Sequence, residues 1–317
     1  MIRIQAALAD LGAVALQAES KYNFLNSDVE YKIHYQASLG RPTLGGSVYE
    51  SLDFESLFAE NRSINRRRGG GLEMGTPLRG RLAVKILVGG EQHLFVPLKE
   101  DAAMRSWTLN WTEFQIGIPV QAPEGSRERG GAFLLSFRRG FPQLSGSFDF
   151  LRISATARGV LSLGPWVDLA GLFTSSGFAS ARSVAGGPEV PFFEHEKSGG
   201  YGRLRGYRID EFTARESIFS RLEARVAYPA KLPGPKWGWA LDRLEAVFSL
   251  DLAAGEKHLW SGGAAGFRDA AIHRGIAGGL CFHLLYKGKR RIEVSTLAAR
   301  ALDPGRGTVF YFIHTVR

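Results

Sequence analysis

The sequence contains no apolar run approaching the roughly eighteen residues that a membrane-spanning helix needs. It has one cysteine, Cys281, so no internal disulfide can form, and this thiol is expected to act as a small apolar side chain within a strand. The seven histidines are scattered, and none joins a Cys, Asp or Glu at metal-ligand spacing. The sequence therefore predicts no disulfide framework, no helical membrane anchor and no metal site.

Sequence signatures of catalysis are missing as well. The glycine-rich stretch at residues 199–202 lacks the Gly-Lys-Ser/Thr ending of a phosphate-binding loop, and no G-x-S-x-G nucleophile elbow is present. We therefore expect no enzymatic activity and no cofactor. The triplet Glu194-His195-Glu196 is interpreted as a solvated charged loop rather than a metal site.

Positive charge exceeds negative charge, with 40 Lys and Arg against 31 Asp and Glu and a formal net charge of +9. In a soluble protein this excess would suggest nucleic acid as a partner. The densest basic run, Arg66-Arg67-Arg68, has no interleaved aromatic residues and continues into three glycines, so it is interpreted as a loop. No nucleic-acid partner is expected. The charge is explained better by a β-barrel, in which the basic residues would line a polar lumen or lie in loops that face anionic lipid or polyanionic clients.

Apolar and polar residues alternate with a period of two through most of the chain, which is typical of β-strands. The pattern is cleanest in residues 28–39 and is clear again in 151–163. In residues 216–228, Arg221, Glu223 and Arg225 occupy the face opposite to the apolar one. Three ionised side chains cannot pack into a protein core. A closed antiparallel barrel with lipid outside and a polar lumen inside accommodates both faces.

Five strands are predicted after residue 215, at residues 216–228, 239–253, 274–286, 290–300 and 308–316. Ten or eleven are expected before it, including 48–58, 80–89, 93–98, 105–120, 130–141 and 166–178. Residues 1–18 have the early arginine and apolar centre of a signal peptide, but Asp10 interrupts that centre. We interpret them as a first strand or strand pair and expect the export signal to lie outside this sequence.

Residues 105–120 carry two tryptophans on one face. Trp107, Leu109 and Trp111 share that face, whereas the later apolar residues Phe114 and Ile116 have the opposite phase. The change of phase predicts a β-bulge within the strand. The tryptophans suit an interfacial aromatic girdle, and burial in an ordinary core is the alternative.

The stretch PFFEHEKSGGYGRLRGYRIDEFTARESIFSRLEARVAYP, residues 191–229, joins a charged glycine-rich loop to a long strand. Its Pro-Phe-Phe start, its Leu-Arg-Gly-Tyr turn and its Leu-Glu-Ala-Arg-Val-Ala-Tyr-Pro ending resemble the large surface loop and the next strand of the BamA/TamA superfamily. These outer-membrane β-barrels insert or export other proteins. The group includes two-partner-secretion transporters and patatin-linked barrels.

The resemblance implies a loop whose tip folds into the lumen. Leu204, Arg205, Gly206 and Tyr207 match the tip, with Arg205 as the arginine that pairs with acidic residues on the following strands. Glu223 and Asp251 match those acidic partners. An alternative for Glu223 is a simple pair with an arginine of a neighbouring strand.

The resemblance also implies the architecture and the cellular place. It predicts an all-β transmembrane barrel of sixteen strands in the bacterial outer membrane, formed by residues 1–317 as one domain without the periplasmic POTRA domains usual in the family. The expected partners are outer-membrane lipids and lipopolysaccharide, unfolded β-barrel or secreted client proteins, and periplasmic or lipoprotein accessory subunits.

The resemblance implies protein insertion through a weakly paired seam between the first and last strands, on whose edge a client strand is templated. The seam residues would be Ile2 and Ile4 on the first strand and Tyr311 and Ile313 on the last. Unlike family members that end on phenylalanine, this chain ends on Arg317. The alternatives are an export pore of the two-partner-secretion or patatin-linked type, and a barrel that anchors a periplasmic domain.

Overall fold

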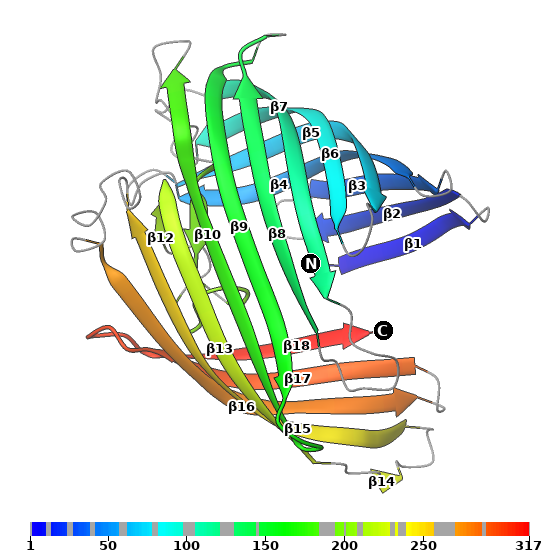
Figure 1. Cartoon of the computed structure of the whole chain (residues 1–317), viewed down its shortest axis with the longest axis vertical. Helices are drawn as coiled ribbons and strands as arrows, with labels where there is room; N and C mark the ends of the chain where they lie inside the picture. Colours follow the sequence, from blue (N-terminus) through cyan, green and yellow to red (C-terminus); the bar gives the residue numbers. More distant parts are fainter. Residues whose placement is uncertain are drawn as a thin grey trace. The chain divides into compact units, whose positions relative to one another are not determined.

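The computed structural model describes most of the chain as β-strands (Figure 1). The described residues are 2–10, 14–23, 28–38, 42–56, 62–77, 82–97, 105–120, 130–143, 146–183, 194–199, 201–207, 212–228, 232–233, 239–256, 270–286 and 290–316. Within these ranges, no helix has the length and the apolar character needed to cross a membrane. The prediction of an all-β fold is confirmed.

Ten strands precede the loop region and form consecutive antiparallel neighbours in one sheet. They are β1 (Ile2–Asp10), β2 (Val14–Asn23), β3 (Asp28–Ser38), β4 (Thr43–Ser56), β5 (Arg62–Pro77), β6 (Ala83–Pro97), β7 (Arg105–Val120), β8 (Gly130–Phe141), β9 (Phe148–Ser162) and β10 (Val167–Ser183). Residues 1–18 thus contain β1 and the start of β2, as the strand-pair interpretation predicted. The β1–β2 register shifts between Ala7 and Ala9.

Five long strands follow the loop region, in agreement with the predicted number. They are β13 (Glu216–Tyr228), β15 (Trp239–Glu256), β16 (Ile272–Tyr286), β17 (Arg290–Ala301) and β18 (Thr308–Val316). Three short strands accompany them: β11 (Glu196–Ser198), β12 (Phe212–Ala214) and β14 (Leu232–Pro233). β11 and β12 form a separate two-stranded sheet, and β14 pairs only with β15.

The hydrogen-bonded order of the large sheet starts at β1 and ends at β18. The sheet has 16 strands only when the two-residue β14 is included. Among the described residues, no pairing joins β1 to β18. A closed barrel of sixteen strands, as expected from the resemblance, is therefore not confirmed.

The chain divides into two compact units. Unit 1 comprises residues 1–118, 134–153 and 178–194, and unit 2 comprises residues 119–133, 154–177 and 195–317. β8, β9 and β10 therefore each contribute residues to both units. The loop tip and the five long strands after it belong to unit 2.

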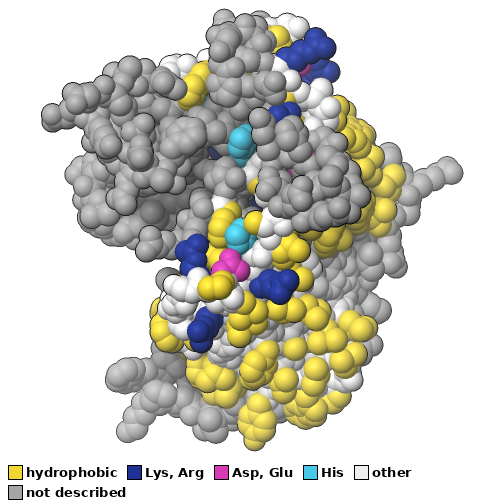
Figure 2. Space-filling model, turned by 90° about the vertical axis from the view of Figure 1, so that its left-hand side faces the viewer, with side chains coloured by type: hydrophobic (Ala, Val, Ile, Leu, Met, Phe, Trp, Pro, Cys, Tyr) yellow, Lys and Arg dark blue, Asp and Glu magenta, His cyan; other side chains and the backbone are white. Residues whose placement is uncertain are grey.

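The two faces of the strands differ in chemistry as the alternation predicted. Large apolar side chains are exposed at alternate positions, such as Leu222 on β13 at 56% and Phe248 on β15 at 58%. On the face of the molecule drawn in Figure 2, hydrophobic side chains cover broad areas of the described surface. On the opposite face the acidic residues Glu223, Glu245 and Asp251 are buried.

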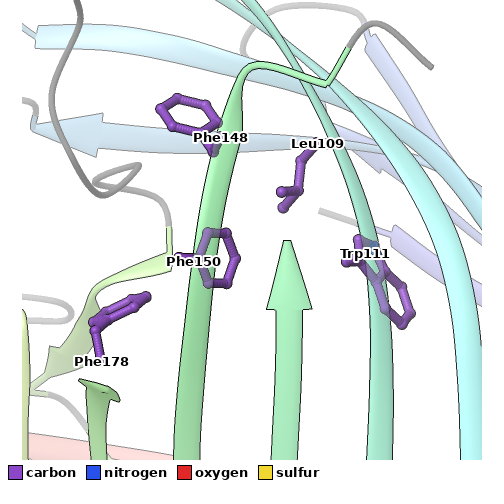
Figure 3. Close-up of a cluster of buried hydrophobic side chains, with 5 residues drawn as sticks. All are labelled: Leu109, Trp111, Phe148, Phe150 and Phe178. Carbon is purple, nitrogen blue, oxygen red and sulfur yellow. The ribbon is translucent and has the colours of Figure 1, made fainter. Parts of the chain in front are cut away.

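Unit 1 contains a buried aromatic cluster, drawn in Figure 3, which corrects the prediction of an interfacial tryptophan girdle. The cluster consists of Leu109, Trp111, Phe148, Phe150 and Phe178, and Trp107 packs against it. Phe150 and Phe178 meet edge to face with ring centroids 5.5 Å apart. The tryptophans therefore belong to a core, because their strand turns that face inward.

The predicted bulge within β7 is also wrong. β7 pairs with β6 in an unbroken register from Ala83↔Gly117 to Phe95↔Arg105. Successive side chains of β7 continue to point to opposite faces. The apolar residues change face along the strand: Trp111 is buried on one face, whereas Phe114 and Ile118 are exposed on the other.

Two further predictions in unit 1 fail because charged and glycine residues are accommodated within strands. Residues 66–71, expected to be a loop, lie within β5, where Glu50 on β4 accepts hydrogen bonds from the Nε atoms of Arg66 and Arg68. Two strands were expected at residues 80–89 and 93–98, but the structure has the single strand β6 (Ala83–Pro97), which runs through Gly89 and Gly90 opposite glycines of β5.

The exposed apolar face generates a prediction, because the family resemblance implies that it meets lipid. Ile33→Arg on β3 or Ile153→Arg on β9 should cost about 2 to 4 kcal/mol for a position near the bilayer midplane. Gln36→Arg, on the opposite face of β3, is the control and should cost little. Folding into lipid vesicles, followed by heat-modified electrophoretic mobility, measures the effect. Unchanged folding of both isoleucine variants would show that the assigned facing is wrong.

Candidate functional site

The loop tip, residues 201–207, lies beside the small β11–β12 sheet in unit 2. β11 and β12 pair antiparallel from Glu196↔Ala214 to Ser198↔Phe212, so the chain that leaves β11 returns beside it. Leu204, Arg205, Gly206 and Tyr207, which lie between these strands in sequence, are all buried. A segment with this charge and glycine content is ordered only where it finds specific partners.

Arg205 finds those partners on β13 and β15. Its Nη2 donates to Glu223 Oε2 at 2.7 Å, and its Nη1 donates to Ser249 Oγ at 2.8 Å. Its backbone N–H donates to Asp251 Oδ2 at 2.9 Å. The residue is only 3% exposed. The structure thus brings Arg205 together with both acidic residues that the resemblance assigned to it.

The register of β13 and β15 explains why these partners converge. Arg221 lies directly opposite Asp251, and Glu223 lies directly opposite Ser249, so all four side chains share one face. Charge-assisted hydrogen bonds are stronger when water is partly excluded, and buried carboxylates require such donors.

Two more arginines complete the cluster. Arg221 binds Asp251 in a bidentate manner, with Nε–Oδ1 at 2.8 Å and Nη2–Oδ2 at 2.9 Å. Its Nη2 also donates to the carbonyl oxygens of Tyr201 and Arg203 in the tip. Arg225 donates to Glu223 Oε1 at 2.7 Å. Glu223 therefore pairs both with the tip arginine and with an arginine of its own strand.

Gly206 is required by the backbone that follows Arg205. Its φ of 89° lies in the left-handed region, where a side chain is strained. A Cβ at this position would lie 2.4 Å from the backbone nitrogen of Ala301 on β17. On β16, a Cβ at Gly275 would lie 2.2 Å from the carbonyl oxygen of Arg205. The tip thus rests directly on the backbones of β16 and β17.

The apolar residues of the tip pack beside the ionic cluster. Leu204 and Tyr207 form a buried group with Phe219, Ala253 and Ala301. The Tyr207 hydroxyl donates to the carbonyl oxygen of Arg274 at 3.0 Å. Burial, followed by the nearby carboxylate of Asp303, raises the pKa of Tyr207 to about 12. The hydroxyl therefore keeps the proton that it donates over the whole physiological pH range.

The seam residues take different places in the structure. The Tyr311 hydroxyl on β18 accepts a hydrogen bond from the Gly206 N–H at 3.2 Å, and the Tyr311 and Tyr201 rings lie 5.7 Å apart. Ile313 packs at the edge of a cluster formed by Val247, Cys281 and Leu297. The backbones of Ile2 and Ile4 pair with Tyr22 and Ser20 of β2, and their side chains lie outside the described set.

The contact between Tyr311 and the tip was not predicted from the sequence. Tyr311 and Gly206 are 105 residues apart, and no local pattern links them. The only available signal was alternation: Tyr311 shares a strand face with Ile313 and lies opposite to the exposed Phe310 and Phe312.

A second ionic network, in unit 1, was also missed by the sequence analysis. Arg138 on β8 approaches Glu91 at 3.3 Å, Glu113 at 3.9 Å and Glu194 at 2.9 Å. Arg152 adds a bond to Glu194 at 3.3 Å. Glu194 is therefore buried between two arginines, which corrects its interpretation as part of a solvated loop.

Glu91 is the most enclosed acid of this network. Arg67 Nε lies 2.9 Å from its Oε2, and the Trp111 indole N–H donates to its Oε1 at 3.0 Å. Its strand neighbour His93 approaches Oε2 at 3.3 Å. Each unit thus buries carboxylates on the polar face of its strands and satisfies them with arginines.

No protein-family model and no curated protein sequence matches the chain. Solved structures do match it over nearly the whole of its length. One is BamA from Haemophilus ducreyi lacking POTRA domains 1–3, with a TM-score of 0.66, 13% identity, and coverage of 99% of this chain and 69% of that one. The fold is that of BamA.

CdiB proteins share this fold. CdiB from Escherichia coli matches with a TM-score of 0.63, 13% identity, and coverage of 99% of this chain and 62% of that one. CdiB from Acinetobacter baumannii matches with a TM-score of 0.61, 10% identity, and coverage of 96% of this chain and 53% of that one. The structural neighbours are thus BamA and CdiB barrels, and the likeness concerns the fold.

The Arg205 contacts generate a prediction for a double-mutant cycle. Arg205→Ala should lower the free energy of unfolding by about 1 to 3 kcal/mol, because Glu223 Oε2 and Ser249 lose their donor. The loss should stay near the lower end, since Arg225 still holds Glu223 Oε1. Thermal unfolding with Glu223→Gln and Asp251→Asn as second mutations measures the coupling energy.

The matched control is Arg139→Ala, because Arg139 pairs with Asp149 at 2.9 Å on a more exposed part of the sheet. Arg139→Ala should lower the free energy of unfolding by about 0.2 to 1 kcal/mol. Arg205→Glu should be more harmful than Arg205→Ala. Zero coupling of Arg205 with both acids would contradict the anchoring role.

The left-handed backbone of Gly206 gives a further prediction. Gly206→Ala should destabilise the tip by more than about 1 kcal/mol, through both the strained φ and the contact with the Ala301 nitrogen. Gly202→Ala, in the same loop, is the control, since a Cβ there would meet nothing within 4 Å. The rate of limited proteolysis within the loop, compared between the two variants, reports the difference. Equal rates of proteolysis in the two variants would show that the tip does not require glycine at position 206.

Proposed function

We propose that this chain is an outer-membrane β-barrel of the BamA/TamA superfamily and that it helps other proteins to insert into that membrane. The observation that carries the proposal is the anchored tip: Arg205 binds Glu223 and Asp251, and Gly206 binds Tyr311 of the last strand. This arrangement matches the loop motif that the resemblance implies. The shared fold with BamA supports the same assignment.

The chemistry of the two strand faces supports a position in the membrane. Exposed leucine, isoleucine and phenylalanine side chains on one face suit a lipid surface, and buried ion pairs on the other suit a lumen. The proposed surroundings are outer-membrane lipids and lipopolysaccharide. The proposed clients are unfolded β-barrel or secreted proteins, delivered with periplasmic or lipoprotein accessory subunits. The mechanism requires no catalytic step and no cofactor.

Insertion would begin at the seam between β1 and β18. The last strand, β18, has 9 residues, whereas β15 has 18. A short terminal strand offers fewer hydrogen bonds to hold a seam, and an open strand edge can pair with an incoming strand. Through Tyr311 the anchored tip holds the inner face of β18. The loop would thereby keep the last strand in position while its edge exchanges partners.

A second candidate function is protein export through the lumen. The structural likeness to CdiB, a two-partner-secretion pore, favours it. In that case the tip and its ion pairs would act as a plug that a client displaces. The two functions differ in what must open, since insertion needs the seam whereas export needs the lumen.

A disulfide across the seam tests which of these openings is used. A cysteine pair at Ile4 and Ile313 is placed in a Cys281→Ser background, so that no other thiol is present and the Tyr311 hydroxyl is kept. Oxidation should stop insertion of a client barrel into vesicles and leave the barrel folded. Reduction should restore activity.

The control pair is Thr296 with Phe312, which are already neighbours in the β17–β18 register. Its disulfide should form without loss of activity. If insertion activity is unchanged when the seam is fully cross-linked, insertion does not require the seam to open. If transport of a secreted client also continues in that state, the lumenal export function takes its place.

A further inference from the structure

Three side chains with metal-binding groups meet on the polar face of β15 and β16. Glu245 lies directly opposite Cys281 in the register of these strands, and His283 follows two residues later on the same face. Their ligand atoms all lie within 4.8 Å of one another. Glu245 and Cys281 are buried, and His283 is partly buried. The sequence analysis missed this group because one ligand comes from a different strand.

The distances suit a tetrahedral ion. Cys281 Sγ lies 3.6 Å from His283 Nε2, and His283 Nε2 lies 3.4 Å from Glu245 Oε2. Zinc bonds of about 2.3 Å to sulfur and about 2.0 to 2.2 Å to nitrogen and oxygen place tetrahedral ligand atoms about 3.4 to 3.6 Å apart. Two of the three pairs therefore already have the spacing of a zinc site.

The carboxylate of Glu245 is oriented for a cation. Its Oε1 is held by the Arg243 guanidinium. Its Oε2 is buried and accepts no well-aligned hydrogen bond among the described residues, although His283 Nε2 lies 3.4 Å and Arg225 Nη1 4.0 Å away. A buried carboxylate oxygen without a donor is costly, and an ion bonded to it removes that cost. Arg243 would then act as the outer partner that fixes a metal-bound carboxylate.

We infer that Glu245, Cys281 and His283 form a zinc site with a fourth position open to solvent. Thiolate, imidazole and carboxylate together match the borderline softness of Zn²⁺. On binding, the thiol proton of Cys281 leaves to solvent, and the thiolate and the carboxylate balance the two charges of the ion. The inference is independent of the proposed function, because it concerns only the pairing of β15 with β16.

Zinc bound to these three residues would cross-link β15 and β16 on their polar face. The packing of Cys281 with Val247 and Leu297 limits water around the thiolate. Because the ion binds only the folded arrangement, stability should rise with the concentration of zinc. The site would make the second half of the sheet sensitive to the supply of a transition metal.

Zinc binding to the metal-free full chain, folded in detergent, is the test. Titration against a chromophoric chelator should show one Zn²⁺ per chain, and Co²⁺ should give a thiolate-to-cobalt absorption band. Cys281→Ser should weaken zinc binding by more than about 100-fold, and Glu245→Gln should weaken it by at least about tenfold. His93→Gln is the matched control, since His93 forms a His–Glu pair at 3.3 Å without a cysteine. It should bind zinc like the parent chain.

The thiol itself gives a readout that needs no variant. Because Cys281 is the only cysteine in the sequence, its alkylation rate can be followed directly. Zinc should slow that alkylation strongly and raise the melting temperature of the parent chain. The absence of stoichiometric binding, an alkylation rate unchanged by zinc, or equal affinity in Cys281→Ser would each overturn the inference.

Discussion

Burial of charge on the polar face of the strands is the constraint on which the rest of this structure depends. Ionised groups removed from water are tolerated only when charged or hydrogen-bonding partners compensate for the lost hydration. In unit 2 the loop and the strands share this compensation, since Arg205 supplies donors to Glu223, Ser249 and Asp251 while Arg221 and Arg225 of β13 bind Asp251 and Glu223. The loop tip is therefore a structural component of the face that it covers. Its removal would leave buried acids short of partners.

Unit 1 meets the same constraint with different residues. Glu91, Glu113 and Glu194 converge on Arg138, and the indole of Trp111 links this network to the aromatic cluster beside it. Charge and aromatic packing thus occupy one continuous face of the strands. This face carries ion pairs and aromatic side chains together. It therefore cannot be described simply as the water-facing side of a sheet whose other side faces lipid.

Much of the fold could be predicted from the sequence because alternation is a local signal. Residues 216–228 are bounded correctly because their two faces differ so sharply in charge. Residues 66–71 were misread because glycine and arginine favour loops when taken alone, and only the pairing with Glu50 and the glycines opposite makes them strand residues. The partners of Arg205 came from resemblance. Tyr311, Arg138 and the Cys281 cluster depend on strand register, which local pattern does not specify.

The last four long strands shorten in regular steps, from 18 residues in β15 to 15 in β16, 12 in β17 and 9 in β18. Each successive pairing is therefore held by fewer backbone hydrogen bonds than the one before it. Of these pairings, the one that holds the outermost strand β18 is thus the shortest. Among these four strands a break in the pairing would therefore cost least at β18, and it would leave the pairings behind that strand intact.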